Sequence, residues 1–446
     1  MGSIIFLPGI LGSELFLDGE QVWPPTALEA KFGYGRIDKL TDPGLRPGNP
    51  IDSVLCFEIY GPLLRDLGDI ASGNAGAPAR SFHAFGYDWR VDLRDIAANV
   101  AARIDALPAG DLSKISFVGH SMGCLIIRLI LESGLYDAKP WFAAVKSFTA
   151  LAGPHQGAPA ALVRALGLEG TAGLSAADLK RVSADPRYPA LYQLLPAPGV
   201  AALVEAKGNH LTELNLYAEK TAEELGLSWE NLGKAAAIHD VLSRNRRPSS
   251  VEYVYLAGAG NDTWVRTDRV GAQPIPRKGK ETGDGTVPLW SAINSAYIHH
   301  AAPAAHDKVF LNEQIRTLLY FSLDARPAAT AFLSAAQKPL LSIFPIHPVY
   351  ARGKPIDIML VPVRPTRDIS GELIVEFSDG DRNPAFQPFI RLPLAYAGAP
   401  VEQLKIRLDP PSKIGFYRVS FSGSHDLAAT GAAIFVVSDV GGATGE

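Results

Sequence analysis

Short apolar segments alternate with stretches of helical periodicity from the start of the chain to about Leu323. Such alternation is typical of a mostly parallel sheet that helices cover on both faces. We therefore predict an α/β unit over residues 1–325. Its predicted strands are Ile4 to Leu7, Ser81 to Phe85, Ile115 to Val118, Val145 to Leu151 and Val251 to Ala257.

One long stretch departs from this alternation. From about Pro159 to Arg247 the pattern is helical, with segments such as Ala201 to Ala206 and Leu214 to Leu225. We predict a helical insertion over about 159–247, of the kind that forms a lid or cap over a pocket. Additional core helices are the alternative.

After about Pro339 the segments become short, β-rich and separated by turn residues. This pattern predicts a C-terminal all-β sandwich of immunoglobulin-like type over residues 338–440, with a linker at 324–339. The predicted strands are Ile356 to Val363, Glu372 to Phe377, Gln403 to Leu408, Phe416 to Phe421 and Ala432 to Val437.

Composition narrows the class of protein. The chain has 446 residues, too many for a single core, which agrees with two units. Charged residues make up 20%, and the net charge of -4 comes without a long run of Lys or Arg, so we expect no nucleic-acid partner. Cys56 and Cys124 are too few for a disulfide framework and form no CxxC spacing, so we expect neither metal nor cofactor.

The sequence shows no targeting or membrane-spanning segment. The first strand begins at once, without a basic segment and a long apolar run before it. The apolar run from Cys124 to Leu131 is interrupted by Arg128 and is too short to span a bilayer. We therefore expect a cytoplasmic protein.

A candidate nucleophile lies in the middle of the predicted sheet. Gly119 to Gly123 form a G-x-S-x-G pentapeptide between a buried strand and the helical run from Cys124 to Leu131. A strand, a tight glycine turn and a helix are the context of a nucleophile elbow, which holds a strained serine over a helix N-terminus. The pattern predicts Ser121 as the nucleophile, with a plain structural turn as the alternative.

A serine hydroxyl needs a base to take its proton, and in this fold the acid and then the base follow the serine along the chain. Asp284 lies between two glycines after a predicted strand, so we predict it as the acid, with a surface turn as the alternative. The histidines that follow are His299, His300 and His306. We select His306, because it lies in a loop just before the last helical pattern.

Two backbone N–H groups should stabilise the negative charge that develops on the attacked carbonyl oxygen. Met122 follows the nucleophile directly, which makes its amide one predicted donor of the oxyanion hole. The glycine-rich segment from Pro8 to Ser13 follows the first strand and predicts Ile10 as the second donor.

Five motifs in the same order resemble the lecithin:cholesterol acyltransferase and lysosomal phospholipase A2 branch of the α/β-hydrolases, over roughly residues 3–322. The segment from Ala152 to Ala158 also resembles a loop of bacterial lipases. The resemblance implies a lid-covered apolar pocket and ester or acyl chemistry on lipids. The five motifs are Phe6 to Ser13, Gly86 to Arg90, Gly119 to Gly123, Tyr192 to Pro196 and Gly283 to Pro288.

The resemblance has limits. Eukaryotic members carry a disulfide-held membrane-binding excursion after the first strand, and Trp23 to Pro25 stand in that region without flanking cysteines. The β-rich C-terminal region is not covered at all.

The leading hypothesis is a carboxylic ester hydrolase or lipase that acts on lipid or acyl substrates through Ser121, His306 and Asp284. An O-acyltransferase, which passes the acyl group to an alcohol, is the nearest alternative. A non-catalytic interaction protein on a hydrolase scaffold, with the sandwich as its binding part, is the other. Peripheral contact with a lipid surface and the oligomeric state are left open.

Overall fold

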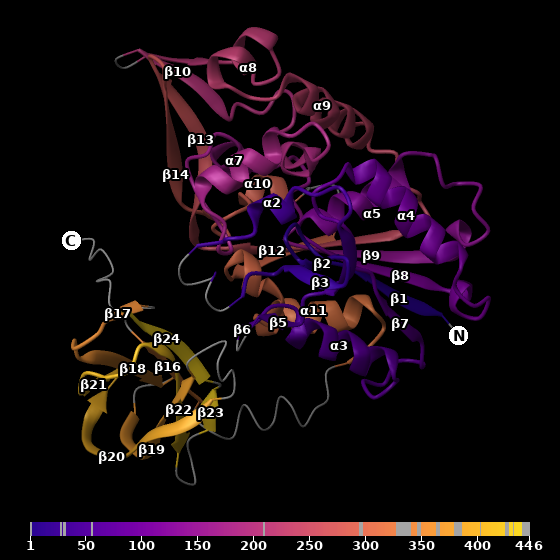
Figure 1. Ribbon diagram of the computed structural model, residues 1–446. Coiled ribbons are helices and arrows are strands. Elements are labelled where there is room, and N and C mark those ends of the chain that lie inside the picture. The colour runs from indigo at the N-terminus through magenta and orange to yellow at the C-terminus, as the bar shows by residue number, and fades with distance from the viewer. Residues whose placement is uncertain are drawn as a thin grey trace. The chain divides into compact units, whose positions relative to one another are not determined.

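The computed structural model describes residues 2–26, 29, 33–54, 57–207, 210–293, 298–326, 340–345, 349–362, 366–378, 386–401, 403–423, 428–430 and 432–438. The chain divides into two compact units (Figure 1). The first comprises Met1–Pro25 and Glu29–Arg326, and the second comprises Thr26–Leu28 and Pro327–Glu446. Most of the predicted linker and the predicted domain limits at 338 and 440 lie outside the described residues, as does Cys56. None of the described helices is long and apolar enough to cross a membrane.

A six-stranded sheet forms the centre of the first unit. All its strand pairs are parallel, and their order is β15-β12-β9-β8-β1-β7, which confirms the predicted α/β class. The edge strand β15 is absent from the sequence prediction, because its polar and small residues do not form an apolar run. The strands are β1 (Ser3–Leu7), β7 (Ser81–Ala84), β8 (Ile115–His120), β9 (Val145–Leu151), β12 (Glu252–Ala259) and β15 (Ile298–Pro303).

Helices cover both faces of this sheet (Figure 1). Successive side chains of a strand point to opposite faces. Ile5 and Leu7 of β1 therefore enter one core, whereas Ile4 and Phe6 enter the other. The first core also takes side chains from α4 (Leu93–Asp105) and α5 (Met122–Glu132), and the second from α3 (Gly61–Ala71) and α11 (Glu313–Ser322).

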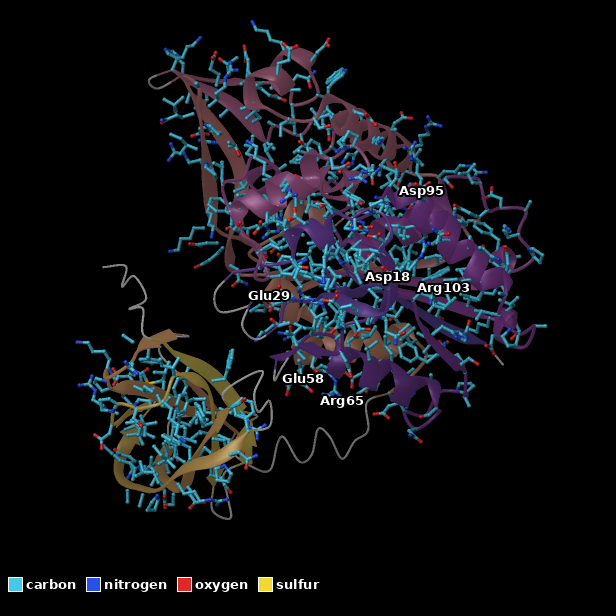
Figure 2. All side chains as sticks on the ribbon, in the orientation of Figure 1. Asp18, Glu29, Glu58, Arg65, Asp95 and Arg103 are labelled. Atoms are coloured by element: carbon cyan, nitrogen blue, oxygen red, sulfur yellow. The ribbon has the colours of Figure 1, made fainter. Side chains whose placement is uncertain are left out.

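Helix α4 shows how local sequence and burial agree. The Asp92 carboxylate caps the helix by accepting the Arg94 backbone N–H at 2.9 Å. The charged side chains of Asp95 and Arg103 lie on its exposed side (Figure 2). The buried positions recur at helical spacing, at Leu93, Ile96, Ala97, Val100, Ala101 and Ile104.

The insertion contains helices, but one predicted helical segment is wrong. Residues 201–206 overlap the strand β10 (Leu203–Lys207), which pairs with β11 (His210–Glu213) and with β13 (Asn261–Val270). The pairing partner β13 lies some sixty residues later, so a long-range ladder overrides the local preference of Ala, Leu and Glu for helix. The second predicted segment, 214–225, is helical only from Glu219.

The remaining elements of the first unit are mostly short. A long hairpin of β13 and β14 (Gln273–Gly283) follows β12 and is also absent from the sequence prediction. The helices are α2 (Ile37–Leu40), α6 (Pro159–Ala165), α7 (Ala176–Ala184), α8 (Glu219–Leu225), α9 (Trp229–Ser243) and α10 (Leu289–Ala292). The 3-10 helices are η1 (Asp111–Ser113), η2 (Phe142–Ala144), η3 (Pro189–Leu194) and η4 (His306–Leu311), and the small strands are β2 (Ser13–Leu17), β3 (Glu20–Trp23), β4 (Arg46–Pro50), β5 (Ser53–Val54) and β6 (Phe57–Glu58).

The second unit is a β-sandwich, as the sequence predicts. Leu341 and Ile358 from one sheet share a core with Leu373, Tyr417 and Phe435 from the other. One sheet has the order β21-β18-β16-β23 and the other β17-β24-β22-β19-β20. Their strands are β16 (Leu340–Pro345), β17 (Val349–Ala351), β18 (Ile356–Pro362), β19 (Thr366–Ser378), β20 (Gln387–Val401), β21 (Leu404–Leu408), β22 (Gly415–Gly423), β23 (Ala428–Thr430) and β24 (Ala432–Ser438).

The long strand β20 is missing from the sequence prediction. Pro388, Pro393 and Pro400 interrupt its apolar residues and argue against a strand when they are read locally. Because β20 lies at the edge of its sheet, it tolerates residues that cannot donate to a second neighbour.

Arg128, which interrupts the apolar run of α5, belongs to a buried ion pair. Its guanidinium donates to Glu132 at 2.9 and 2.7 Å, and both residues are almost fully buried. It also donates to the carbonyl of Leu242 in α9 at 2.9 Å. A second buried cation, Arg247, has its Nε 3.6 Å from the same carboxylate. The Glu132 carboxylate therefore compensates two buried guanidinium groups.

We predict that Glu132→Leu lowers the free energy of unfolding by roughly 3–5 kcal/mol, because it leaves buried cations uncompensated. The double variant Arg128→Met/Glu132→Leu should recover part of this loss, since it leaves only Arg247 without the carboxylate, whereas the single variant leaves both cations without it. Urea unfolding followed by tryptophan fluorescence measures both effects. A double variant as unstable as the single one would contradict this account.

Candidate active site

Ser121 occupies a tight turn between β8 and α5. Its backbone has φ 52° and ψ -122°, an unusual conformation for a residue other than glycine, and its N–H donates to the carbonyl of Leu151 at 2.9 Å. The flanking glycines are required sterically. A Cβ at Gly123 would lie 2.3 Å from the carbonyl oxygen of Leu7, and one at Gly119 would lie 2.8 Å from Ile127 Cδ1. The pentapeptide therefore has the local geometry of a nucleophile elbow.

The structure brings Ser121, His306 and Asp284 together in that order. His306 Nε2 lies 2.9 Å from Ser121 Oγ, and His306 Nδ1 lies 2.7 Å from Asp284 Oδ2. The backbone N–H of His306 also donates to the carbonyl of Asp284 at 2.9 Å. The imidazole is thus oriented by one residue through two separate contacts.

The Asp284 carboxylate is buried but fully partnered. Its Oδ1 accepts the backbone N–H groups of Thr286 at 2.9 Å and Val287 at 2.7 Å. The tight loop needs Gly283, where a Cβ would lie 2.3 Å from the carbonyl oxygen of Val287. These two amides fix the orientation of the carboxyl group, whose Oδ2 faces His306.

His299 and His300, the other histidines weighed as the base, lie elsewhere. Both belong to the edge strand β15, beside Tyr255 and Leu256 of β12. His299 is exposed, and the His300 ring lies 3.4 Å from Gln314 Oε1. Neither ring contacts Ser121 in the described part of the chain.

The two predicted oxyanion donors come from two different segments next to the nucleophile. Met122 is the first residue of α5, and Ile10 lies in the loop after β1. Among the described contacts neither backbone N–H donates a hydrogen bond. A Cβ at Gly9 would lie 2.9 Å from Ser121 Cβ, so this loop packs directly against the serine.

The loop from Pro8 to Gly12 is held by aromatic side chains that local motifs do not reveal. The Tyr60 hydroxyl accepts the Gly9 N–H at 2.8 Å, the Trp23 indole donates to the Leu11 carbonyl at 2.8 Å, and the Tyr87 hydroxyl donates to the Pro8 carbonyl. Of these, the resemblance covers only Tyr87. Tyr60 has no sequence signal, because it lies 51 positions from its partner.

A cavity of about 660 Å³ lies beside Ser121 and His306 and is lined mostly by apolar side chains. The loop after β1 contributes Ile10 and Leu11. The insertion at about 159–247 contributes Ala160, Ala161, Leu179, Val182, Leu191 and Leu194. Both the predicted oxyanion loop and the insertion therefore line the same cavity.

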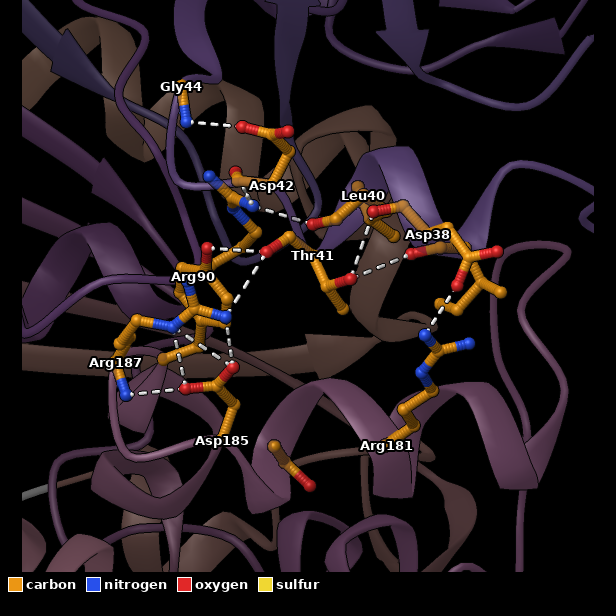
Figure 3. Close-up of polar contacts among 12 residues, drawn as sticks. Asp38, Leu40, Thr41, Asp42, Gly44, Arg90, Arg181, Asp185 and Arg187 are labelled. Carbon is orange, nitrogen blue, oxygen red and sulfur yellow. Dashed lines mark hydrogen bonds and ion pairs between the residues drawn. The ribbon is translucent and has the colours of Figure 1, made fainter.

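Arg90 joins the tyrosine–aspartate–tryptophan–arginine block to this cavity wall. Its buried guanidinium pairs with Asp88 at 2.9 and 2.7 Å and donates to the carbonyls of Leu40 and Asp42 (Figure 3). It also lies over the ring of Tyr188, 4.4 Å from the centroid. These contacts tie the α2 segment to the insertion.

Charged residues of the insertion add to this connection. Arg187 pairs with Asp185 and donates to the carbonyl of Thr41, and Arg181 pairs with Asp38 (Figure 3). Both pairs are exposed, so each adds little to stability on its own.

The parallel sheet with helices on both faces and the tight strand–turn–helix connection after β8 define the α/β-hydrolase fold. Residues 72–224 match the family model of lecithin:cholesterol acyltransferase, which confirms the resemblance over this part of the chain. The matched segment includes the Gly86 to Arg90 block and the elbow.

One solved structure shares this fold, and two others are similar to a smaller degree. A chain in the crystal structure of the Tle4-Tli4 complex is 15% identical with a TM-score of 0.51, and the match covers 71% of this chain and 96% of that one. Lipase BlEst2 of Bacillus licheniformis is 13% identical with a TM-score of 0.36, and the match covers 73% of this chain and 92% of that one. The lin2722 product of Listeria innocua is 11% identical with a TM-score of 0.33, and the match covers 74% of this chain and 96% of that one. The first likeness shows the fold alone.

The search of curated proteins yields no match. The family match and the fold together support an enzyme that acts on acyl esters, as a hydrolase or an acyltransferase.

We predict that Gly123→Ala lowers the free energy of unfolding by about 1–3 kcal/mol, because the added methyl forces α5 away from the end of β1. The matched control is Gly233→Ala in α9, where an added Cβ meets nothing within 4 Å. This control should gain about 0.5–1 kcal/mol from the higher helix preference of alanine. Thermal unfolding of both variants tests the close approach of α5 to β1. Equal changes in the free energy of unfolding in the two variants would contradict it.

Proposed function

We propose that the protein is a serine hydrolase that cleaves carboxylic esters of lipid or acyl substrates through a covalent acyl-enzyme. The observation that carries this proposal is the unbroken sequence of contacts from Ser121 Oγ to His306 and from His306 to Asp284, beside an apolar cavity. Each contact has the length of a good hydrogen bond.

The proposed mechanism follows from the donors and acceptors. An ionised Asp284 can only accept hydrogen bonds, so it accepts one from the Nδ1–H group of His306. Nε2 of His306 is then free to accept the serine proton. Ser121 Oγ then attacks the ester carbonyl carbon while His306 removes its proton. The resulting imidazolium is stabilised by the buried Asp284 carboxylate.

The N–H groups of Met122 and Ile10 are proposed to stabilise the charge on the carbonyl oxygen, because these two positions supply the oxyanion hole in this class of site. Collapse of the tetrahedral intermediate breaks the ester bond, and His306 returns the proton to the departing alcohol. Water, deprotonated by His306, then attacks the carbonyl carbon of the acyl-enzyme, and the carboxylic acid is released as His306 returns the proton to Ser121.

The cavity supports an apolar acyl group as the part of the substrate that is recognised. Apolar side chains, chiefly alanine, leucine and valine, make up most of the lining, although Arg90, Arg164 and Asp307 also belong to it. Burial of each methylene of an acyl chain contributes about 0.8 kcal/mol. We assign the insertion at about 159–247 the role of a lid that keeps water from this cavity.

Acyl transfer to an alcohol is the second candidate function, and the family match favours it. It uses the same acyl-enzyme and differs only in the second nucleophile. Turnover of a p-nitrophenyl ester in the presence of a long-chain alcohol separates the two. A hydrolase yields free acid in proportion to p-nitrophenol, whereas an acyltransferase yields a new ester.

We propose no catalytic group in the second unit. The residues of the serine site and those that line the cavity belong to Met1–Arg326. The role of the sandwich as a recognition domain rests on its architecture alone.

We predict that Ser121→Ala abolishes ester hydrolysis, with a loss of roughly 10⁶-fold as in well-studied triads, and leaves the thermal unfolding transition in place. A fluorophosphonate probe should label the native protein at Ser121 and leave the variant unlabelled. Activity in the variant above about a tenth of the native rate would move the nucleophile elsewhere. Absence of labelling in the native protein would favour the non-catalytic alternative.

We predict that Asp284→Asn lowers kcat about 10⁴-fold, because an amide in this position favours the wrong tautomer of His306. Asp262→Asn is the control, since Asp262 lies on the neighbouring hairpin and accepts only the backbone N–H of Glu281 at 3.0 Å in the described contacts. Steady-state kinetics on a short p-nitrophenyl ester compare the two. A similar loss of kcat in both variants would contradict the role of Asp284 in orienting His306.

A further inference from the structure

Two buried side chains beside the site have no part in the mechanism above. Tyr60 precedes α3, and His120 precedes the nucleophile; they are 4% and 5% exposed. Tyr60 Oη accepts the Gly9 N–H at 2.8 Å and lies 2.7 Å from His120 Nδ1. His120 Nε2 lies 3.0 Å from the carbonyl oxygen of His306. The contacts form a continuous chain from the oxyanion loop to the residue that carries the base.

The direction of every hydrogen bond in this chain is determined. A carbonyl oxygen only accepts, so His120 Nε2 carries the hydrogen that reaches His306. Burial, with a contribution from the neighbouring His306, lowers the pKa of His120 to about 3, which keeps its ring neutral. Nδ1 is therefore an acceptor, and the Tyr60 hydroxyl donates to it while accepting from Gly9. Exchanging donor and acceptor in any one of these hydrogen bonds would break another hydrogen bond of the chain.

Packing leaves little room for this chain to shift. Phe310 of η4 lies 5.9 Å from the ring of Tyr60 and 5.8 Å from that of His120 between centroids. On the other side Phe6 meets the Tyr60 ring at 5.2 Å. A Cβ at Gly9 would lie 3.3 Å from both Tyr60 Oη and His120 Nδ1, so the loop backbone rests on the two polar atoms.

We propose that Tyr60 and His120 are positioning residues that set the distance between the Ile10 oxyanion donor and the His306 base. The proposal rests on the function proposed above. The Gly9 amide precedes the Ile10 amide by one residue, so the bond from Gly9 to Tyr60 fixes the loop that presents Ile10. The bond from His120 fixes the turn that presents His306. Ser121 lies between them.

The positioning of the Ile10 donor is expected to matter mainly in the transition state. The oxyanion exists only after Ser121 attacks, and the ester carbonyl of the bound substrate makes weaker use of the same donors. Loss of the Tyr60 hydroxyl should therefore lower kcat and leave KM nearly unchanged. A small displacement of a positioned donor is enough to cost one or two powers of ten in rate.

The test compares Tyr60→Phe with Tyr320→Phe. Tyr320 is equally buried in the same core, and its hydroxyl contacts Asp66 at 3.1 Å, away from the site. We expect Tyr60→Phe to lower kcat about tenfold on a short p-nitrophenyl ester, with KM within twofold, and Tyr320→Phe to keep the native kcat. The dissociation constant of an alkylboronic acid, which forms a tetrahedral adduct with the serine, should rise about tenfold in Tyr60→Phe alone.

A structural role would produce a different result. If Tyr60→Phe loses only thermal stability, by as much as Tyr320→Phe, and keeps native kcat and boronic acid affinity, the positioning proposal is wrong. Fluorophosphonate labelling of the native protein at Ser121 separates this outcome from failure of the proposed function, which would abolish labelling altogether.

A second variant tests the chain itself. His120→Gln retains an amide N–H that can reach the His306 carbonyl but removes the Nδ1 acceptor, so its kcat should fall by a factor similar to that in Tyr60→Phe. The double variant should be little slower than either single one, because one break already uncouples the chain. A double variant whose loss of kcat is the product of the two single losses would overturn the proposal. If Tyr60→Phe does not fold, the kcat of His120→Gln decides the question alone.

Discussion

The close approach of α5 to the end of β1 is the constraint on which the site depends. The backbone at Ser121 adopts a conformation that costs a residue with a side chain on the order of 1–3 kcal/mol, and it persists because its neighbours leave no alternative. Gly123 lets the helix touch the carbonyls of Leu7 and Pro8, and Leu151 holds the Ser121 amide. The strain is thus maintained by a core that is buried on both faces of the sheet.

Four separate parts of the chain meet at one end of the sheet. Parallel strands end at the same side, so the loops after β1, β8 and β15 meet there, and the hairpin after β12 returns Asp284 to this edge. The buried polar groups of the serine site have partners, from the Asp284 carboxylate to the Tyr60 hydroxyl. An apolar cavity can therefore lie beside charged chemistry without leaving an unpaired group in the triad.

The cavity wall and the core are coupled by a few buried cations. Arg90 holds the α2 segment and lies on Tyr188 of the insertion, while Arg128 connects α5 with α9. Both guanidinium groups donate to backbone carbonyls as well as to a carboxylate, which is how a buried charge becomes tolerable. The insertion is thus attached to the scaffold at two separate points, Tyr188 through Arg90 and Leu242 through Arg128.

The sequence by itself determined the features that arise from short stretches of chain. The apolar strands β1, β8 and β9 were recognisable because both their faces are buried, and the elbow, Asp284 and His306 followed from motif context and order. Only the tertiary structure decided that 203–207 is a strand, that β15 and β20 complete their sheets, and that Tyr60 joins Gly9 to His120. These depend on partners tens of residues away, whose pairing and burial no local pattern encodes.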